Sequence, residues 1–205
     1  MIKIAITGGI CSGKSTVCKY IEKLGYVVYY SDNIAIDLAN YNKNLQNEII
    51  KEFGILSFIN REYNRRYIAN IVFGNKVALN KLNNIFKPYL VENLKQIYNN
   101  ENYNIIFYET ALLFEYELQN EFDIIFNVYA DKELVIKRLK ERNNFTDIEI
   151  ENRLKSQLDP NIKIKKSDFN INTSENIEWK KKVELYLKKI NKSKEYIYHN
   201  LALFV

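Results

Sequence analysis

One stretch decides the fold of this chain: residues 8–16, which read Gly8-Gly9-Ile10-Cys11-Ser12-Gly13-Lys14-Ser15-Thr16. They match the pattern G-x-x-x-x-G-K-[ST], in which glycines let consecutive backbone N–H groups converge on phosphate oxygens. At this spacing Lys14 reaches the outer phosphates of a nucleotide, and the Ser15 hydroxyl is placed to ligate Mg²⁺. We therefore predict a nucleotide-binding loop over Gly9 to Thr16, with ATP and Mg²⁺ as cofactors.

The residues on both sides of this loop support the motif. Residues 2–6 read IKIAI, a short apolar run that is typical of a buried strand. After the loop, apolar residues recur at helical spacing until Gly25, a residue type that commonly ends helices. The alternative is a plain glycine turn between two core elements, but strand, glycine loop and helix in this order are the context that the motif requires.

The rest of the chain alternates strands with helices. We predict four further strands, over residues 25–30, 103–109, 123–129 and 168–172. In the second half of the chain, helices are predicted over residues 132–143, 147–158 and 174–190. Thr146 is a candidate N-cap for the helix at residues 147–158. Such alternation is typical of a parallel sheet covered on both faces. The predicted fold class is therefore α/β, a phosphate-loop kinase or NTPase fold with a five-stranded parallel sheet flanked by helices.

Residues 34–100 interrupt this alternation. Their pattern is helical with no clear strand, and one helix is expected to bend or restart near Pro88. The block is too long for a single crossover helix, so we predict a helical insertion that binds the substrate. The chain is then one kinase domain, divided into a core (1–33, 101–137 and 161–205), this insertion (34–100) and a lid (138–160).

Two predicted strands are followed by carboxylates at the sheet edge that faces the ligand in open parallel sheets. Asp32 follows the predicted strand at residues 25–30 and could accept the proton of an attacking hydroxyl. The alternative role for Asp32 is to cap a helix that starts near Ile34. Glu109 ends the strand at residues 103–109, where an acid commonly helps to hold Mg²⁺. We predict Asp32 and Lys14 as catalytic residues and Ser15 and Glu109 as metal ligands.

Two arginines suggest a lid over the phosphates. Arg138 and Arg142 are four residues apart and lie on one face of a predicted helix. Their planar guanidinium groups match phosphate oxygens, and closure of such a helix excludes water from the reaction. The alternative is a solvated helix face shared with Glu133 and Glu141. We predict that Arg138 binds ATP and that Arg142 acts in catalysis.

Composition narrows the class of partner. The net charge of +5 suits an anionic substrate, but it is too small and too dispersed to indicate nucleic-acid binding. No stretch approaches the length of a membrane span, and we expect no signal peptide before the first strand. Cys11 and Cys18 lack metal-ligand spacing and fit a reducing compartment. We expect a cytoplasmic protein that acts on small molecules, binds neither nucleic acid nor membrane, and is a monomer or weak oligomer.

Cys11 admits two interpretations. A helix N-terminus lowers the pKa of a thiol, which makes Cys11 a candidate redox switch. Alternatively, Cys11 is a tolerated small residue at a variable loop position.

Several motifs together resemble the dephospho-CoA kinase family. Residues 6–17 resemble the family's opening, which usually reads TGGIGSGKSTV, and residues 32–35 resemble its D-x-[IL]-A segment. Residues 109–115 read ETALLFE and resemble D-x-P-L-L-[FV]-E. The likeness continues through Ser156-Gln157 and residues 168–172, so it covers nearly the whole chain. The chain departs from the family pattern at several positions: Cys11 for Gly, Tyr30 for an acid, Lys87 for His, Glu109 for Asp and Ala111 for Pro.

This resemblance implies ATP-dependent phosphorylation of the ribose 3′-hydroxyl of dephospho-CoA, the last step of coenzyme A synthesis. It implies that Asp32 is the general base, that Lys14 and Ser15 serve ATP and Mg²⁺, and that Arg142 is a lid contact to phosphate. It also implies that the helices of residues 34–100 form the CoA-binding lobe.

Two alternative functions fit the same motifs. One is a different small-metabolite or nucleotide kinase of the same architecture. The other is a regulatory switch that binds ATP without transferring phosphate, in which Asp32 has no chemical role. A GTPase is not expected, because the chain lacks the guanine-reading N-K-x-D motif.

Overall fold

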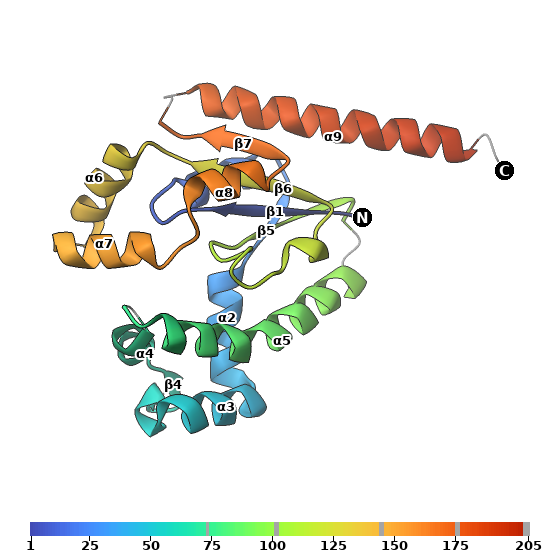
Figure 1. Cartoon of the computed structure of the whole chain (residues 1–205). Coiled ribbons are helices and arrows are strands. Elements are labelled where there is room, and N and C mark those ends of the chain that lie inside the picture. Colours follow the sequence, from blue (N-terminus) through green and yellow to red (C-terminus); the bar gives the residue numbers. More distant parts are fainter. Residues whose placement is uncertain (73, 101–102, 144–145, 175–176, 203–205) are drawn as a thin grey trace.

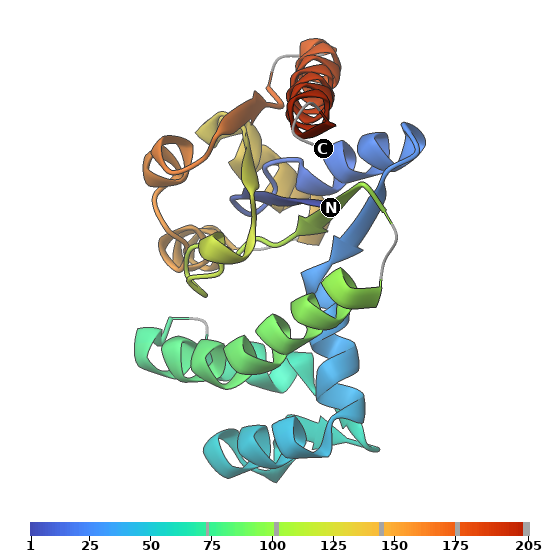
Figure 2. The same ribbon diagram turned by 90° about the vertical axis from the view of Figure 1, so that its right-hand side faces the viewer.

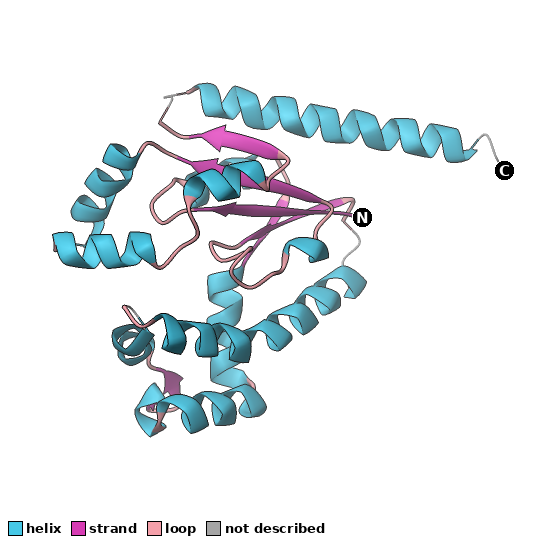
Figure 3. Cartoon of the chain, in the orientation of Figure 1, coloured by secondary structure: helices cyan, strands magenta, loops and turns pink. Residues whose placement is uncertain are grey.

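Five parallel strands form the central sheet of the computed structural model (Figure 3). The structure describes residues 1–72, 74–100, 103–143, 146–174 and 177–202. Within these ranges, the side chains of residues 100, 142–143 and 193–202 are not described. The strands lie in the order β2 (Val27–Tyr30), β5 (Ile105–Glu109), β1 (Ile2–Gly8), β6 (Ile124–Tyr129) and β7 (Phe169–Asn172). All four neighbouring pairs are parallel. The predicted five-stranded parallel sheet is confirmed.

The register of this sheet brings the ends of three strands together. Glu109, the last residue of β5, pairs with Ile6 of β1 on one side and with Tyr30 of β2 on the other. The phosphate loop therefore leaves β1 at the edge where β2 and β5 also end, as expected for a ligand crevice in an open parallel sheet.

Helices cover one face of the sheet along its length. Helix α1 (Lys14–Lys23) and helix α9 (Glu178–Ala202) pack there, and α9 runs along the sheet in Figure 1. Their buried side chains contact strand residues that point to this face: Val17, Cys18 and Ile21 of α1, and Val183, Leu187 and Ile190 of α9. The last helix, predicted over residues 174–190, begins four residues later, at Glu178, and continues to Ala202.

The opposite face is covered partly by the segment that follows β5. Leu113, Phe114 and Leu118 of this segment pack against Ala5 and Ile125. A short 3₁₀ turn, η2 (Gln119–Glu121), then leads to β6. This segment lies between the sheet and the helical insertion and packs against both, because its Tyr116 also contacts the core of the insertion.

The insertion is a helical unit with its own core (Figure 2). It contains α2 (Ser31–Tyr41), α3 (Lys43–Phe53), the 3₁₀ turn η1 (Ile55–Ser57), α4 (Arg65–Val72) and α5 (Lys76–Asn100). Leu45, Ile49, Ile68, Phe86 and Leu90 are among the buried residues of this core. Helix α5 is continuous through Pro88, so the predicted restart there is wrong.

The expectation of no strand in this insertion is also wrong. Phe58–Ile59 (β3) and Glu62–Tyr63 (β4) form a small antiparallel hairpin. Asn60 and Arg61 both have positive φ, at 52° and 68°, as a two-residue hairpin turn requires. Two-residue strands are too short to leave an alternating pattern in the sequence, so periodicity could not reveal them.

Three short helices connect β6 with β7: α6 (Lys132–Asn143), α7 (Asp147–Lys155) and α8 (Pro160–Lys165). Thr146 caps α7 in a capping box with Glu149, as predicted for this threonine. Helix α7 ends at Lys155 rather than near residue 158, because Pro160 opens a separate helix that Asp159 caps. In the part of the chain that the structure describes, no helix is long and apolar enough to cross a membrane.

Candidate active site

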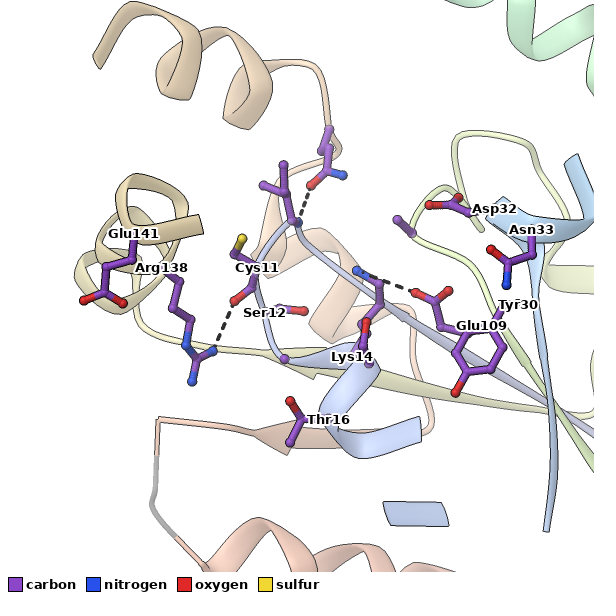
Figure 4. Close-up of a pocket in the computed structure, with 15 residues that line it drawn as sticks. Cys11, Ser12, Lys14, Thr16, Tyr30, Asp32, Asn33, Glu109, Arg138 and Glu141 are labelled. Carbon is purple, nitrogen blue, oxygen red and sulfur yellow. Dashed lines mark hydrogen bonds and ion pairs between the residues drawn. The ribbon is translucent and has the colours of Figure 1, made fainter. Parts of the chain in front are cut away.

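A cavity of about 730 Å³ opens at the carboxyl ends of β1, β2 and β5 (Figure 4). Asp32 and Arg138 approach it from opposite sides, with the phosphate loop between them. The lining residues belong to the phosphate loop, the end of β2 with the start of α2, the end of β5, and the predicted lid. They are Ile10, Cys11, Ser12, Gly13, Lys14, Ser15, Thr16, Tyr30, Asp32, Asn33, Glu109, Ala111, Arg138, Glu141 and Gln157.

Close contacts, with backbone at Gly8 and with a side chain at Gly13, explain why two glycines are needed in the phosphate loop. A Cβ atom on Gly8 would lie 2.0 Å from the carbonyl oxygen of Val128, and one on Gly13 would lie 2.9 Å from Oγ1 of Thr173. Gly13 also has φ of +94°, which glycine adopts at no steric cost. Helix α1 begins directly afterwards at Lys14. Its free N–H groups and the positive end of its dipole are therefore available to an anion at the loop.

Lys14 is almost buried at the centre of the site. Its Nζ atom donates hydrogen bonds to the carbonyl oxygens of Gly8 (3.2 Å) and Gly9 (3.0 Å), and it lies 3.9 Å from Oε1 of Glu109. Burial lowers the pKa of Lys14, against the opposing effect of the Glu109 carboxylate. Burial likewise raises the pKa of Glu109, against the effect of Lys14. The charged form of each side chain is thus stabilised by the other, at a position that little water reaches.

Asp32 lies in the first turn of α2, which begins at Ser31. Tyr30 is the residue at the N-cap position, and it makes no side-chain cap, so the alternative that Asp32 caps a helix near Ile34 is wrong. A carboxylate in the first turn is favoured by the helix dipole. Asp32 is exposed and lines the cavity, and its negative charge reinforces the raised pKa of Glu109. It is therefore free to meet a ligand.

Arg138 of α6 contacts the phosphate loop directly. Its Nη1 atom donates to the carbonyl oxygen of Cys11 (3.1 Å) and to Oγ1 of Thr173 (3.2 Å). The Thr173 hydroxyl in turn donates to the carbonyl oxygen of Ser12 (2.7 Å). Arg142 lies on the same helix, but its side chain is outside the described residues, so the structure places only one of the two predicted arginines.

Gln157 holds the other side of the loop. The N–H of Ile10 donates to its Oε1 atom at 2.8 Å. Gln157 follows α7, so the loop is hydrogen-bonded both by α6, through Arg138, and by the residue pair after α7, through Gln157. The single sequence offered Gln157 only through the family resemblance, and it offered no signal for Thr173.

The two cysteines differ in their surroundings. Cys11 has a positive φ of 53° and is half-buried against Val135 and Leu139 of α6. Cys18 is buried in the sheet core, and burial raises the pKa of its thiol. The packing of Cys11 against α6 is compatible with a tolerated small residue, and a redox role of this thiol stays a hypothesis.

The predicted metal ligands have the chemistry that Mg²⁺ prefers. Ser15 and Glu109 line the same cavity and offer a hydroxyl and a carboxylate oxygen. Across the described ranges, no group of three or more His, Cys, Asp or Glu side chains could hold a metal ion. Mg²⁺ commonly binds through one or two carboxylates together with substrate phosphates and water. The pair therefore fits an ion that arrives with a nucleotide.

The structure brings most of the predicted site residues together. Residues 10–16, Asp32, Glu109 and Arg138 all line the cavity, and Gly9 contributes the carbonyl oxygen that holds Lys14. Sequence reasoning assigned no role to other lining residues: Tyr30, Asn33, Ala111, Glu141 and Gln157. Tyr30 and Asn33 flank the predicted base, so their places follow from the end of β2.

Comparison with known proteins agrees over nearly the whole chain. The sequence model of the family described as "Dephospho-CoA kinase" matches residues 2–178. The dephospho-CoA kinase of Fusobacterium nucleatum is 38% identical over 190 residues, which cover 91% of this chain and 97% of that protein. The dephospho-CoA kinase of Rickettsia typhi is 34% identical, over 84% of this chain and 88% of that protein.

Solved structures agree with these sequence matches. The dephospho-CoA kinase from Campylobacter jejuni superimposes with a TM-score of 0.65 and 27% identity, over 94% of this chain and 98% of that chain. The protein TT1252 from Thermus thermophilus reaches a TM-score of 0.77 at 25% identity, over 94% and 97%. The matched residues 2–178 include the phosphate loop, Asp32, Glu109 and Arg138. Since the family model matches residues 2–178 and relatives of this family are 34–38% identical over most of the chain, the chain belongs to the dephospho-CoA kinase family.

Proposed function

We propose that this chain transfers the γ-phosphoryl group of ATP to the ribose 3′-hydroxyl of dephospho-CoA, which completes coenzyme A. One observation carries the proposal: Asp32 and the phosphate loop line the same cavity from opposite walls. Phosphoryl transfer needs the donor phosphates, the acceptor hydroxyl and a proton acceptor within one enclosed space. An ATP-binding switch has no need of the carboxylate.

The phosphate loop binds the donor. Its N–H groups and the N-terminus of α1 surround the β- and γ-phosphates, and Lys14 exchanges the carbonyl oxygens of Gly8 and Gly9 for phosphate oxygens. Ser15 and Glu109 would hold Mg²⁺, which when bound neutralises charge on the phosphates. Because Lys14 is already buried, little solvent must be removed from it as the nucleotide arrives.

Asp32 acts on the acceptor. Its carboxylate receives the proton of the ribose 3′-hydroxyl as the oxygen attacks the γ-phosphorus in line with the leaving oxygen. The N-terminal end of α2 holds Asp32, so the insertion of residues 34–100, which we propose as the acceptor-binding lobe, is directly joined to the proposed base.

The α6–α7 segment acts as the lid. Arg138 already contacts the loop through Cys11, and we assign it to the phosphates together with Arg142 of the same helix. A lid over residues 138–160 excludes water, so that transfer to the acceptor is faster than hydrolysis.

The proposal is tested with purified protein, Mg-ATP and a panel of acceptors: dephospho-CoA, nucleoside monophosphates and shikimate. We expect dephospho-CoA alone to stimulate ADP release, with coenzyme A identified by mass spectrometry. Stimulation by another acceptor instead indicates a different metabolite kinase. ATP binding without stimulation by any acceptor supports the regulatory switch and contradicts the proposal.

A further inference from the structure

A buried lysine lies beside the phosphate-loop cavity, and the proposed mechanism does not use it. Lys163 of α8 is only 1% exposed and does not line the cavity. Its Nζ atom lies 2.9 Å from Oε1 of Glu115 and donates a hydrogen bond to the carbonyl oxygen of Ala111 at 2.8 Å. Both acceptors belong to the segment that follows β5, so one ammonium group holds this segment at two points.

The same carboxylate oxygen also fixes the connection between α7 and α8. Oε1 of Glu115 accepts a hydrogen bond from the N–H of Leu158 at 2.9 Å. Asp159 then caps α8, and its carbonyl oxygen accepts the N–H of Lys163 at 3.2 Å. The short stretch from Leu158 to Lys163 is therefore attached to Glu115 at both of its ends.

This attachment leads directly to the phosphate loop. The residue before Leu158 is Gln157, whose Oε1 atom accepts the N–H of Ile10 at 2.8 Å. Gln157 and Ala111 both line the cavity. The contacts of Glu115 and Lys163 thus fix the backbone beside Gln157 and, through Ala111, the backbone just beyond the end of β5.

Stability alone does not explain a charged pair at this place. Moving two charges out of water costs free energy, and apolar residues often replace a buried ion pair without loss of stability. Hydrogen bonds differ from apolar contacts because they fix the distance and direction between donor and acceptor. Here one ammonium group and one carboxylate oxygen together fix two backbone groups, the N–H of Leu158 and the carbonyl oxygen of Ala111.

We propose that Glu115 and Lys163 are positioning residues for ATP: they hold Gln157 against the phosphate loop and thereby set the shape in which the loop receives the nucleotide. Neither residue lines the cavity, so both act through the backbone at Leu158. The inference rests on the part of the proposed function in which the loop binds ATP, and it does not depend on the identity of the acceptor.

The main test removes both charges at once, because Lys163→Met alone leaves Glu115 as an unpaired buried charge. In the double variant Glu115→Leu/Lys163→Met, the N–H of Leu158 loses its acceptor. Circular dichroism and urea unfolding establish that the variant is folded before binding is measured. Calorimetry with Mg²⁺ and a non-hydrolysable ATP analogue should then give a Kd roughly fivefold higher than that of the wild type, the effect of one lost hydrogen bond.

Lys165→Met is the matched control, since Lys165 is an exposed lysine of the same helix and does not line the cavity. Its Kd for the ATP analogue should equal that of the wild type. A Kd that rises equally in Lys165→Met would show that any lost positive charge weakens binding, and it would overturn the positioning role.

A third variant shows whether the effect passes through Gln157. Gln157→Leu removes the acceptor of the Ile10 N–H and should raise the Kd roughly fivefold in the wild-type background. In the background of Glu115→Leu/Lys163→Met it should cause little further rise, because residues that act through one contact are not additive. Additive effects would mean that the buried pair does not act through Gln157.

A further measurement uses the wild-type chain and so does not depend on the folding of a variant. If the buried pair sets the affinity for ATP, bound ATP must stabilise the contacts of the pair by the same coupling. Amide hydrogen exchange followed by NMR should therefore slow at Leu158 when the ATP analogue is added, although Leu158 does not line the cavity. The N–H of Tyr63, which donates to Oδ1 of Asn40 in the helical insertion, should be unaffected.

The two proposals fail in different ways. If the wild-type chain binds the ATP analogue, but the folded double variant binds it equally well or the exchange at Leu158 does not respond, the positioning role is wrong and the proposed function stands. If the wild-type chain does not bind the ATP analogue, the proposed function fails and the positioning role falls with it.

Discussion

Nζ of Lys14 and Oε1 of Glu109 lie 3.9 Å apart, and their side chains are only 10% and 11% exposed. Neither charge has much water around it, so each depends on the other. The pair therefore connects the protonation of the phosphate-binding lysine to the last residue of β5. Its consequence is a pH dependence that can be measured.

Glu109→Gln should shift the alkaline limb of kcat/KM for ATP to lower pH. Burial already lowers the pKa of Lys14, and the Glu109 carboxylate opposes this effect. Removing the negative charge lowers the lysine pKa further, so Lys14 loses its proton at a lower pH. The measurement is a pH profile of kcat/KM for ATP. Glu141→Gln removes a charge from the same cavity and should leave the limb in place; equal profiles for Glu109→Gln and wild type would contradict the coupling.

Asp32→Asn should lower kcat by roughly 10²–10⁴, the usual contribution of a positioned general base. Asparagine keeps the size of the side chain but cannot take up the proton of the hydroxyl. The KM for ATP should change little, because Asp32 lies across the cavity from the phosphate loop. Steady-state kinetics with dephospho-CoA give both values.

Asp37→Asn is the matched control for this change, since Asp37 is an exposed acid on the same helix and does not line the cavity. Its kcat should equal that of the wild type. Unchanged turnover in Asp32→Asn would remove Asp32 from the mechanism.

Thr173→Val should weaken ATP binding. Valine keeps the shape of threonine but removes the hydroxyl that donates to the carbonyl oxygen of Ser12 and accepts from Arg138. We expect the KM for ATP to rise roughly fivefold to tenfold, as for the loss of one or two hydrogen bonds. Thr173→Ser retains the hydroxyl and should restore the KM. A high KM in Thr173→Ser would show that packing against Gly13, rather than the hydroxyl, positions the loop.

Lys163→Met should lower the free energy of unfolding by roughly 3–5 kcal/mol, because it leaves Glu115 as a buried charge without its partner. Lys163 is only 1% exposed and bonds both Glu115 and Ala111. Urea denaturation monitored by circular dichroism measures the change. Lys155→Met removes an exposed ion pair with Glu151 and should cost at most about 1 kcal/mol. Similar losses in both variants would show that the buried pair contributes no more than a surface pair.

The parts of the site that could be predicted from the sequence are those that depend on local order along the chain. The phosphate loop is one continuous motif, and its place after β1 follows from the apolar run before it. Asp32 and Glu109 could be placed because the carboxyl ends of parallel strands meet at one edge. The register, in which Tyr30 pairs with Glu109, confirms that reasoning.

The parts that could not be predicted depend on contacts between distant segments. Lys163 belongs to a run of lysines that has no apolar pattern, yet it is buried because Glu115 and Ala111 supply its acceptors. Thr173 acts through a hydrogen bond to a residue 161 positions away, which no local signal records. The short helix α8 and the hairpin of β3 and β4 are smaller than the windows in which periodicity can be recognised.

The helical insertion leaves the sheet from β2 through α2 and leads back to β5 through α5, and these two strands are neighbours. Both attachments are thus at the edge of the sheet formed by β2 and β5. Asp32 lies in the first turn of α2 and so belongs to the element that enters the insertion, whereas Glu109 ends β5 and Lys14 begins α1. The distance between the proposed base and the phosphate loop therefore depends on how the insertion is seated on this edge, while the distance between Lys14 and Glu109 does not.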